Sequence, residues 1–105
     1  MANNETRFQS GQVILHTKHG YRGVIVSADE CFQGSDEWYE KAAHSRPSKD
    51  KPWYHVLVDG STYETYVAER HLAIDTSKEP VDHPLVKVFW DELQDGKYLR
   101  NRLMN

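Results

Sequence analysis

The chain has 105 residues, of which 38% are hydrophobic and 28% charged, the size and composition of one soluble globular domain. This excludes large multi-domain enzymes, and no apolar run is long enough to span a bilayer, so we expect no membrane partner. The N-terminus has no signal-peptide pattern, and the single cysteine, Cys31, cannot form an internal disulfide. Both features favour a cytoplasmic location.

The formal net charge is −3, which is not typical of a nucleic-acid-binding domain. The charges are unevenly distributed, because residues 59–95 hold nine acidic and three basic residues. Basic residues concentrate in three segments: 7–28, 41–51 and 97–102. The sequence can therefore present a basic surface only if these segments meet on one face.

The first half of the chain predicts a hairpin. The apolar run 13–16 and the β-branched run 24–26 predict two strands. Gly20 lies between the two predicted strands, and Gly23 directly precedes the second. Glycine at such positions permits a turn or a bulge. We expect Gly23→Val to destabilise the domain by on the order of 1–3 kcal/mol through backbone strain.

Residues 30–52 show no strand pattern. Within them, 35–43 predict one or two helical turns, whose first amides Ser35 or Asp36 can cap. A polar loop bounded by prolines follows.

Three further strands are predicted, at 53–58, 63–68 and 71–74, with Asp59-Gly60 as the turn between the first two.

Alternation along 53–58 places Trp53 and His55 on one face of the sheet and Tyr54 on the other. We therefore expect either Trp53 or Tyr54 to face outward. An exposed aromatic residue beside basic residues would suit a nucleobase or a partner side chain.

The C-terminal segment predicts a helix over residues 84–95. Pro84 suits a first helical position, and Val86, Trp90 and Leu93 recur at helical spacing. Gly96 can end the helix in a left-handed conformation.

These elements predict a mainly β fold: a small, strongly bent antiparallel sheet or SH3-like barrel, with a helical insertion and a C-terminal helix. Residues 1–7 are polar and aperiodic, which predicts a flexible N-terminal arm. Residues 8–105 then form a single domain.

Candidate chemistry is sparse despite six histidines and one cysteine. His16 and His19 are three residues apart, which leaves a histidine-only metal site open, but the paired cysteines of structural zinc sites are absent. No glycine-framed nucleophile motif or phosphate-binding glycine loop occurs. We predict that the protein is not an enzyme and has no cofactor and no resident metal.

Four segments together resemble a known family. They are F-x-x-G-Q-V-x-x-H at 8–16, G-Y-R-G-V-I-V-x-x-D at 20–29, P-W-Y-H-V-L-V at 52–58 and T-Y-V-A-E-x-x-L at 65–72. The pattern resembles the YccV-like, or hemimethylated-DNA-binding, domain over roughly residues 8–100. Glu37-Trp38 and His83-Pro84 are more similar to the branch found in an F-box protein than to the heat-shock protein HspQ.

The resemblance implies a small barrel-like fold and a non-enzymatic binding module for double-stranded DNA, including hemimethylated DNA. The alternative it implies is an adaptor, as in HspQ, that contacts a Lon-type protease or its client proteins in the stress response. It leaves open whether the chain forms a homo-oligomer. If DNA binds, the basic residues we predict at the phosphates are Lys18, Arg22, Lys49 and Lys51.

Overall fold

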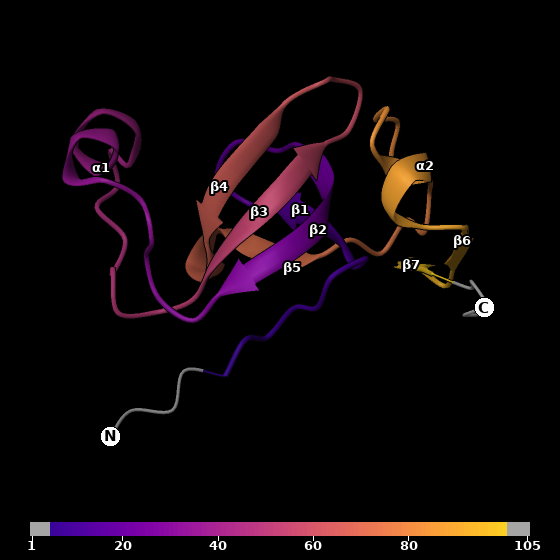
Figure 1. Cartoon of the computed structure of the whole chain (residues 1–105), viewed down its shortest axis with the longest axis horizontal. Coiled ribbons are helices and arrows are strands. Elements are labelled where there is room, and N and C mark those ends of the chain that lie inside the picture. The colour runs from indigo at the N-terminus through magenta and orange to yellow at the C-terminus, as the bar shows by residue number, and fades with distance from the viewer. Residues whose placement is uncertain (1–4, 101–105) are drawn as a thin grey trace.

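The computed structural model describes residues 5–100. The strands are β1 (Val13–His16), β2 (Arg22–Asp29), β3 (Trp53–Val58), β4 (Glu64–Ala68), β5 (Leu72–Ile74), β6 (Glu92–Gln94) and β7 (Lys97–Leu99). The helices are α1 (Asp36–Ala42), the short 3₁₀ turn η1 (Glu69–His71) and α2 (Val86–Phe89). Figure 1 shows α1 at one end of the main sheet and α2 with β6 and β7 at the other.

The main sheet is antiparallel, with strand order β4-β3-β2-β1-β5. This confirms the predicted mainly β class and the two hairpins. The two edge strands, β4 and β5, are joined in sequence by η1 and are not paired with each other. Among the described strands the sheet therefore does not close into a barrel, and the outer edge of β4 is left without a neighbouring strand.

Both faces of the sheet are covered. One face packs Ile25, Tyr54 and Val56 against Phe8 and Leu72. The other packs Val24 and Leu57 against residues of the C-terminal segment, and Trp53 against Tyr39 of α1.

The expectation that either Trp53 or Tyr54 faces outward is wrong. Trp53 is 2% exposed and Tyr54 is fully buried. The two side chains do point to opposite faces, but α1 covers the face that carries Trp53.

The helical insertion forms as its sequence predicts. Ser35 caps α1, since its Oγ accepts a hydrogen bond from the backbone N–H of Trp38 at 3.0 Å. The insertion places Trp38 and Ala42 beside β4, at the edge of the sheet.

The C-terminal helix is much shorter than the predicted 84–95. It covers only Val86–Phe89, and Trp90 already has extended backbone angles. The helical pattern fails because Asp95-Gly96 forms a two-residue hairpin turn, with φ values of 55° and 81°, between β6 and β7. Gly96 is left-handed as predicted, but in a hairpin and not at a helix end.

The C-terminal hairpin pairs with the segment before β1. Gln12 and Lys97 form an antiparallel bridge, and the N–H of Tyr98 donates to the carbonyl of Gly11 at 2.7 Å. No helix within residues 5–100 has the length and apolar character needed to cross a membrane.

Candidate functional site

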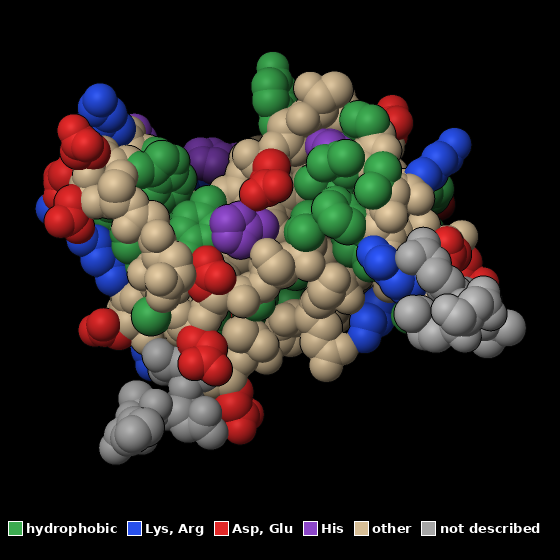
Figure 2. All heavy atoms as spheres, in the orientation of Figure 1, with side chains coloured by type: hydrophobic (Ala, Val, Ile, Leu, Met, Phe, Trp, Pro, Cys, Tyr) green, Lys and Arg blue, Asp and Glu red, His purple; other side chains and the backbone are tan. Residues whose placement is uncertain are grey.

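A hollow of about 490 Å³ lies along the outer edge of β4. It is lined by the turn after β1, the end of α1 with the segment that follows it up to residue 47, strand β4 and η1. Five of the six histidines line it: His16, His19, His44, His55 and His71. We call it the histidine pocket. Figure 2 shows histidine side chains at the surface between α1 and the sheet.

The pairing of β4 with β3 directs part of its backbone into this pocket. The N–H of Val58 bonds to the carbonyl of Tyr63, and the N–H of Glu69 bonds to that of Pro52. Because hydrogen-bonded and non-hydrogen-bonded pairs alternate along antiparallel strands, the N–H and C=O groups of Tyr66 point away from β3. The wall formed by β4 therefore presents both backbone donors and acceptors.

One wall of the pocket is a stack of imidazole rings. The ring centroid of His16 lies 4.6 Å from that of His19 and 5.5 Å from that of His71. His16 is 4% exposed, and its Nδ1 accepts hydrogen bonds from the backbone N–H groups of Lys18 and His19. In the neutral ring the proton is then on Nε2.

Burial, with the nearby His19 and His71, lowers the pKa of His16 to about 4. Burial also lowers the pKa of His71, with contributions from the neighbouring cations Arg70 and Lys18. His16 and His71 are therefore neutral at pH 7, and these two rings offer imidazole donors and acceptors without positive charge.

The opposite wall is aromatic. Trp38 meets Tyr66 edge to face, with ring centroids 5.8 Å apart, and the His55 ring lies 4.6 Å from that of Tyr66. The Tyr66 hydroxyl donates to Asp29 at 2.6 Å; burial, then this hydrogen bond, raises its pKa to about 12. A second hollow of about 330 Å³ lies across Trp38, His55 and Tyr66, so these rings border two hollows.

The acidic residues at this wall are bridged by a histidine. His55 Nδ1 lies 2.9 Å from Glu64 Oε2, and its Nε2 lies 3.4 Å from Asp29 Oδ2. The rim beside β4 therefore carries negative charge, whereas Lys18 and Arg70 lie on the side of His71.

The predicted DNA-contacting lysines are on the surface. Lys18 is exposed and lines the histidine pocket. Lys49 is also exposed, but its Nζ lies 3.0 Å from Asp36 Oδ1 and 4.3 Å from the centre of the Tyr39 ring. Lys51 is exposed in the same loop as Lys49.

The fourth predicted contact, Arg22, is held within the fold. Its Nη1 lies 3.1 Å from Asp59 Oδ2, and its Nε lies 3.2 Å from Asp75 Oδ2. Its Nη2 donates to the carbonyl of Glu79 at 2.5 Å, and its Nη1 donates to that of Pro80 at 3.2 Å. The guanidinium links β2 to the segment before α2.

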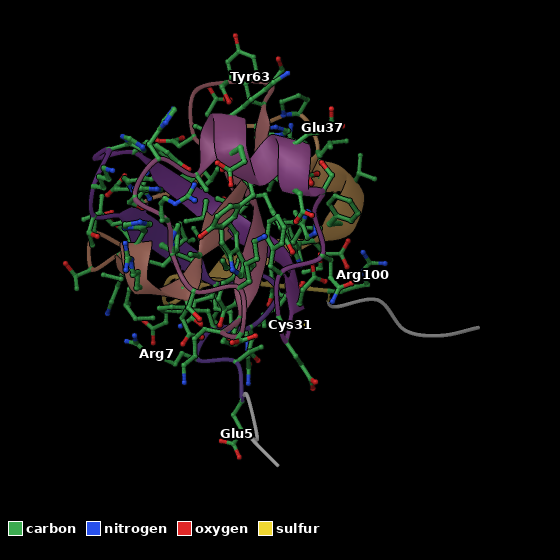
Figure 3. The ribbon with its side chains drawn as sticks, turned by 90° about the vertical axis from the view of Figure 1, so that its left-hand side faces the viewer. Glu5, Arg7, Cys31, Glu37, Tyr63 and Arg100 are labelled. Carbon is green, nitrogen blue, oxygen red and sulfur yellow. The ribbon has the colours of Figure 1, made fainter. Side chains whose placement is uncertain are left out.

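The basic side chains do not form one patch on the face shown in Figure 2, where Lys and Arg lie toward its two ends. In Figure 3, Arg7, of the first basic segment, lies at the lower left of the molecule, and Arg100, of the third, lies at the right. Arg102, in the third segment, lies outside the described residues.

Sequence reasoning did not identify Arg70 or the convergence of the histidines. Arg70 Nη2 donates to the carbonyl of Ser45 at 2.9 Å, beside the pocket. Ser45 Oγ and His71 Nε2 are 2.8 Å apart. The count of six histidines and the spacing of His16 and His19 were the only signals, since the five histidines of the pocket come from four separate segments that meet only through the fold. Within residues 5–100, no three His, Cys, Asp or Glu side chains are placed to hold a metal ion.

A protein-family model matches most of the chain. The model is described as "Hemimethylated DNA-binding protein YccV like", and the match covers residues 6–97. The matched range includes all of the main sheet, α1 and the histidine pocket.

Proposed function

The chain belongs to the YccV-like family, and from this membership we propose that it binds double-stranded DNA, with a preference for DNA methylated on one strand. The family match over residues 6–97 is the observation that carries the proposal. The proposed activity is recognition without catalysis.

The surface around the histidine pocket supports this proposal. Lys18 and Arg70 are exposed cations near His71, at one rim of the pocket. We propose that they contact phosphates, together with the exposed Lys49 and Lys51. The ion pairs of Arg22 with Asp59 and Asp75 make it the least available of the predicted contacts.

The net charge of −3 sets the expected strength of binding. Phosphate contacts dominate affinity for DNA and weaken steeply with salt. With few cations at the surface, we expect weak binding to DNA of any sequence. Selective binding at physiological salt then has to come from contacts with the bases.

Fluorescence anisotropy with three duplexes of one sequence tests the proposal: unmethylated, methylated on one strand, and methylated on both. Each is titrated at low and at physiological salt. Tighter binding of the hemimethylated duplex that persists at physiological salt is the expected result. Equal binding of all three, lost with salt, would contradict base recognition, and no binding at low salt would contradict the DNA function itself.

A second candidate function rests on an exposed apolar surface away from the pocket. Tyr63, Leu85 and Val88 are 70%, 39% and 60% exposed. His83 connects Tyr63 and Leu85, because its Nε2 lies 3.1 Å from the carbonyl of Tyr63 and its Nδ1 accepts from the N–H of Leu85. Val88 lies on α2, which begins directly after Leu85. Figure 3 shows Tyr63 projecting from the top of the molecule.

We infer that this surface suits a protein partner, as an adaptor to a protease or its clients requires. A Lon-type degradation assay with the full chain tests it. Stimulation of client degradation that is lost in Tyr63→Ser and Val88→Ser would support the adaptor function. No effect of the wild-type chain on degradation would contradict it.

A further inference from the structure

We propose that the histidine pocket receives one nucleobase displaced from the DNA duplex, with the adjoining phosphate held by Lys18 and Arg70. This inference rests on the proposed DNA binding and adds a site and a mode of recognition to it.

The pocket has the size and walls for a planar heterocycle. Its volume of about 490 Å³ lies within the range of roughly 300–1,000 Å³ typical of small-molecule sites. Trp38, His55 and Tyr66 form one wall, and the rings of His16 and His71, stacked with 13° between their planes, form another. Aromatic faces of this kind bind bases by stacking.

The pocket also offers polar groups for the edge of a base. The backbone N–H and C=O of Tyr66 point toward it from β4, as the register with β3 requires. His16 keeps its Nε2–H after Nδ1 is used by two backbone amides. A displaced base is read through hydrogen bonds of this kind combined with stacking.

The charges around the pocket orient such a ligand. Lys18 and Arg70 lie near His71 on one rim, and Glu64 with Asp29 lie beside His55 on the other. A phosphate is attracted to the first rim and repelled by the second. The lowered pKa values of His16 and His71 keep these two rings uncharged at pH 7, which suits the neutral base. The same charges argue against an acidic peptide lying along the whole edge of β4.

Displacement of a base also accounts for DNA recognition without a long helix. Over residues 5–100 the longest helix is α1, with seven residues, and its last turn borders the pocket. The protein therefore reaches base edges more readily in the pocket than by inserting a helix into the major groove.

The experiment compares the full chain on two duplexes of one sequence, one fully paired and one with a single mismatch. Displacing a base costs least where it is already unpaired. We expect the mismatched duplex to bind at least about fivefold more tightly, the lower end of the effect of stacking one base. A third duplex lacks both bases of that pair, with abasic sites opposite each other, so it offers no unpaired base, and we expect it to lose this gain.

Ala42→Trp blocks the pocket without removing a core side chain, because Ala42 is exposed and lines the pocket. Gln94→Trp is the matched control, since Gln94 is exposed on β6 at the other end of the sheet. Circular dichroism and thermal melting check that both variants fold. We expect Ala42→Trp to bind the paired and mismatched duplexes equally, and Gln94→Trp to keep the difference.

The inference and the proposed function fail in different ways. Equal binding of both duplexes by the wild-type chain, or a mismatch preference that survives in Ala42→Trp, would overturn the base pocket and leave DNA binding intact. Competition by an extended peptide, with no mismatch preference, would assign the edge of β4 to strand addition. No binding of any duplex would overturn both proposals.

Discussion

Gly23 and Leu57 approach so closely that a Cβ atom at Gly23 would lie 2.6 Å from the carbonyl oxygen of Leu57. The same atom would lie 2.6 Å from Cγ1 of Val56. Gly23 is not among the glycines with positive φ. The predicted importance of Gly23 therefore comes from the contact between β2 and β3, and the backbone strain expected from the sequence is the wrong cause.

Gly23→Ala is predicted to destabilise the domain by about 1–3 kcal/mol, the usual cost of overpacking, measured by urea unfolding. Gly20→Ala is the comparison, because Gly20 has φ +76° but no atom within 4 Å of its Cβ position. At Gly20 the substitution is destabilising only because alanine disfavours the left-handed conformation, and we expect a loss of about 1 kcal/mol. An unchanged midpoint for Gly23→Ala would contradict the steric reading.

The imidazole stack predicts a pH-dependent stability. The unfolded His16 takes up a proton below pH 6.5, whereas the folded one does so only below about 4. Between these values the unfolded state binds more protons, so stability falls as the pH is lowered. At about 1.4 kcal/mol per pKa unit, His16 contributes a loss of roughly 1–3 kcal/mol.

His16→Asn tests this assignment, because the asparagine oxygen can still accept from the turn amides. Urea unfolding at several pH values between 7 and 4 should show a flatter profile for the variant than for the wild type. If stability fell equally with pH in the variant and the wild type, a group other than His16 would be responsible for the pH dependence.

The fold could be predicted where local chemistry and tertiary contacts agree. The strand 53–58 was predicted with its observed bounds, and α1 was predicted with Ser35 as one of two candidate caps, of which the structure uses Ser35. The prediction failed after residue 89, where a helical spacing of apolar residues competed with a hairpin turn at Asp95-Gly96. That dipeptide is a strong hairpin signal, and it decides the structure here.

The site was harder to predict because its residues come from separate segments. Lys18 was identified, but His16, His55 and His71 meet only after β4 and η1 fold back toward the turn after β1. Arg22 was predicted to contact phosphate, but the structure pairs it with Asp59 and Asp75. The sequence around a basic residue in a strand does not show which distant acidic residues will lie beside it.

Arg22 and Arg46, which both form ion pairs, should differ in their effect on stability. Arg22 is 21% exposed and faces Asp75, which is 9% exposed, so Arg22→Ala leaves partly buried carboxylates unpaired. We predict a loss of about 1–3 kcal/mol. Arg46 and Glu40 are 60% and 62% exposed, and Arg46→Ala should destabilise the domain much less than Arg22→Ala, because solvent screens the exposed pair. Equal losses in thermal or urea unfolding would contradict the structural role of Arg22.

The salt dependence of DNA binding tests Lys18 as a phosphate contact. Lys18→Gln should reduce the slope of log K against log salt by about 0.9, the value for one phosphate contact. Lys87→Gln removes the same charge from α2, at the other end of the sheet, and should leave the slope unchanged. If both variants reduce the slope equally, the salt dependence reflects the net charge of the protein, and Lys18 is not a specific phosphate contact.

The bridge between Gln12 and Lys97 constrains how the chain reaches its native state. Residues 9–13 have their partners at 96–98: the N–H of Val13 bonds to the carbonyl of Gly96, and Lys97 Nζ donates to Gln9 Oε1 across 88 positions. Contacts of such high sequence separation slow folding, because a long loop must close before they form. During synthesis, the segment before β1 can pair early with Ile25 of β2, but its partners in the C-terminal hairpin are made only when nearly the whole chain is complete. Before Tyr98 has been synthesised, the face of the sheet that carries Val13, Val24 and Leu57 is incompletely covered. This apolar face can then bind chaperones or aggregate.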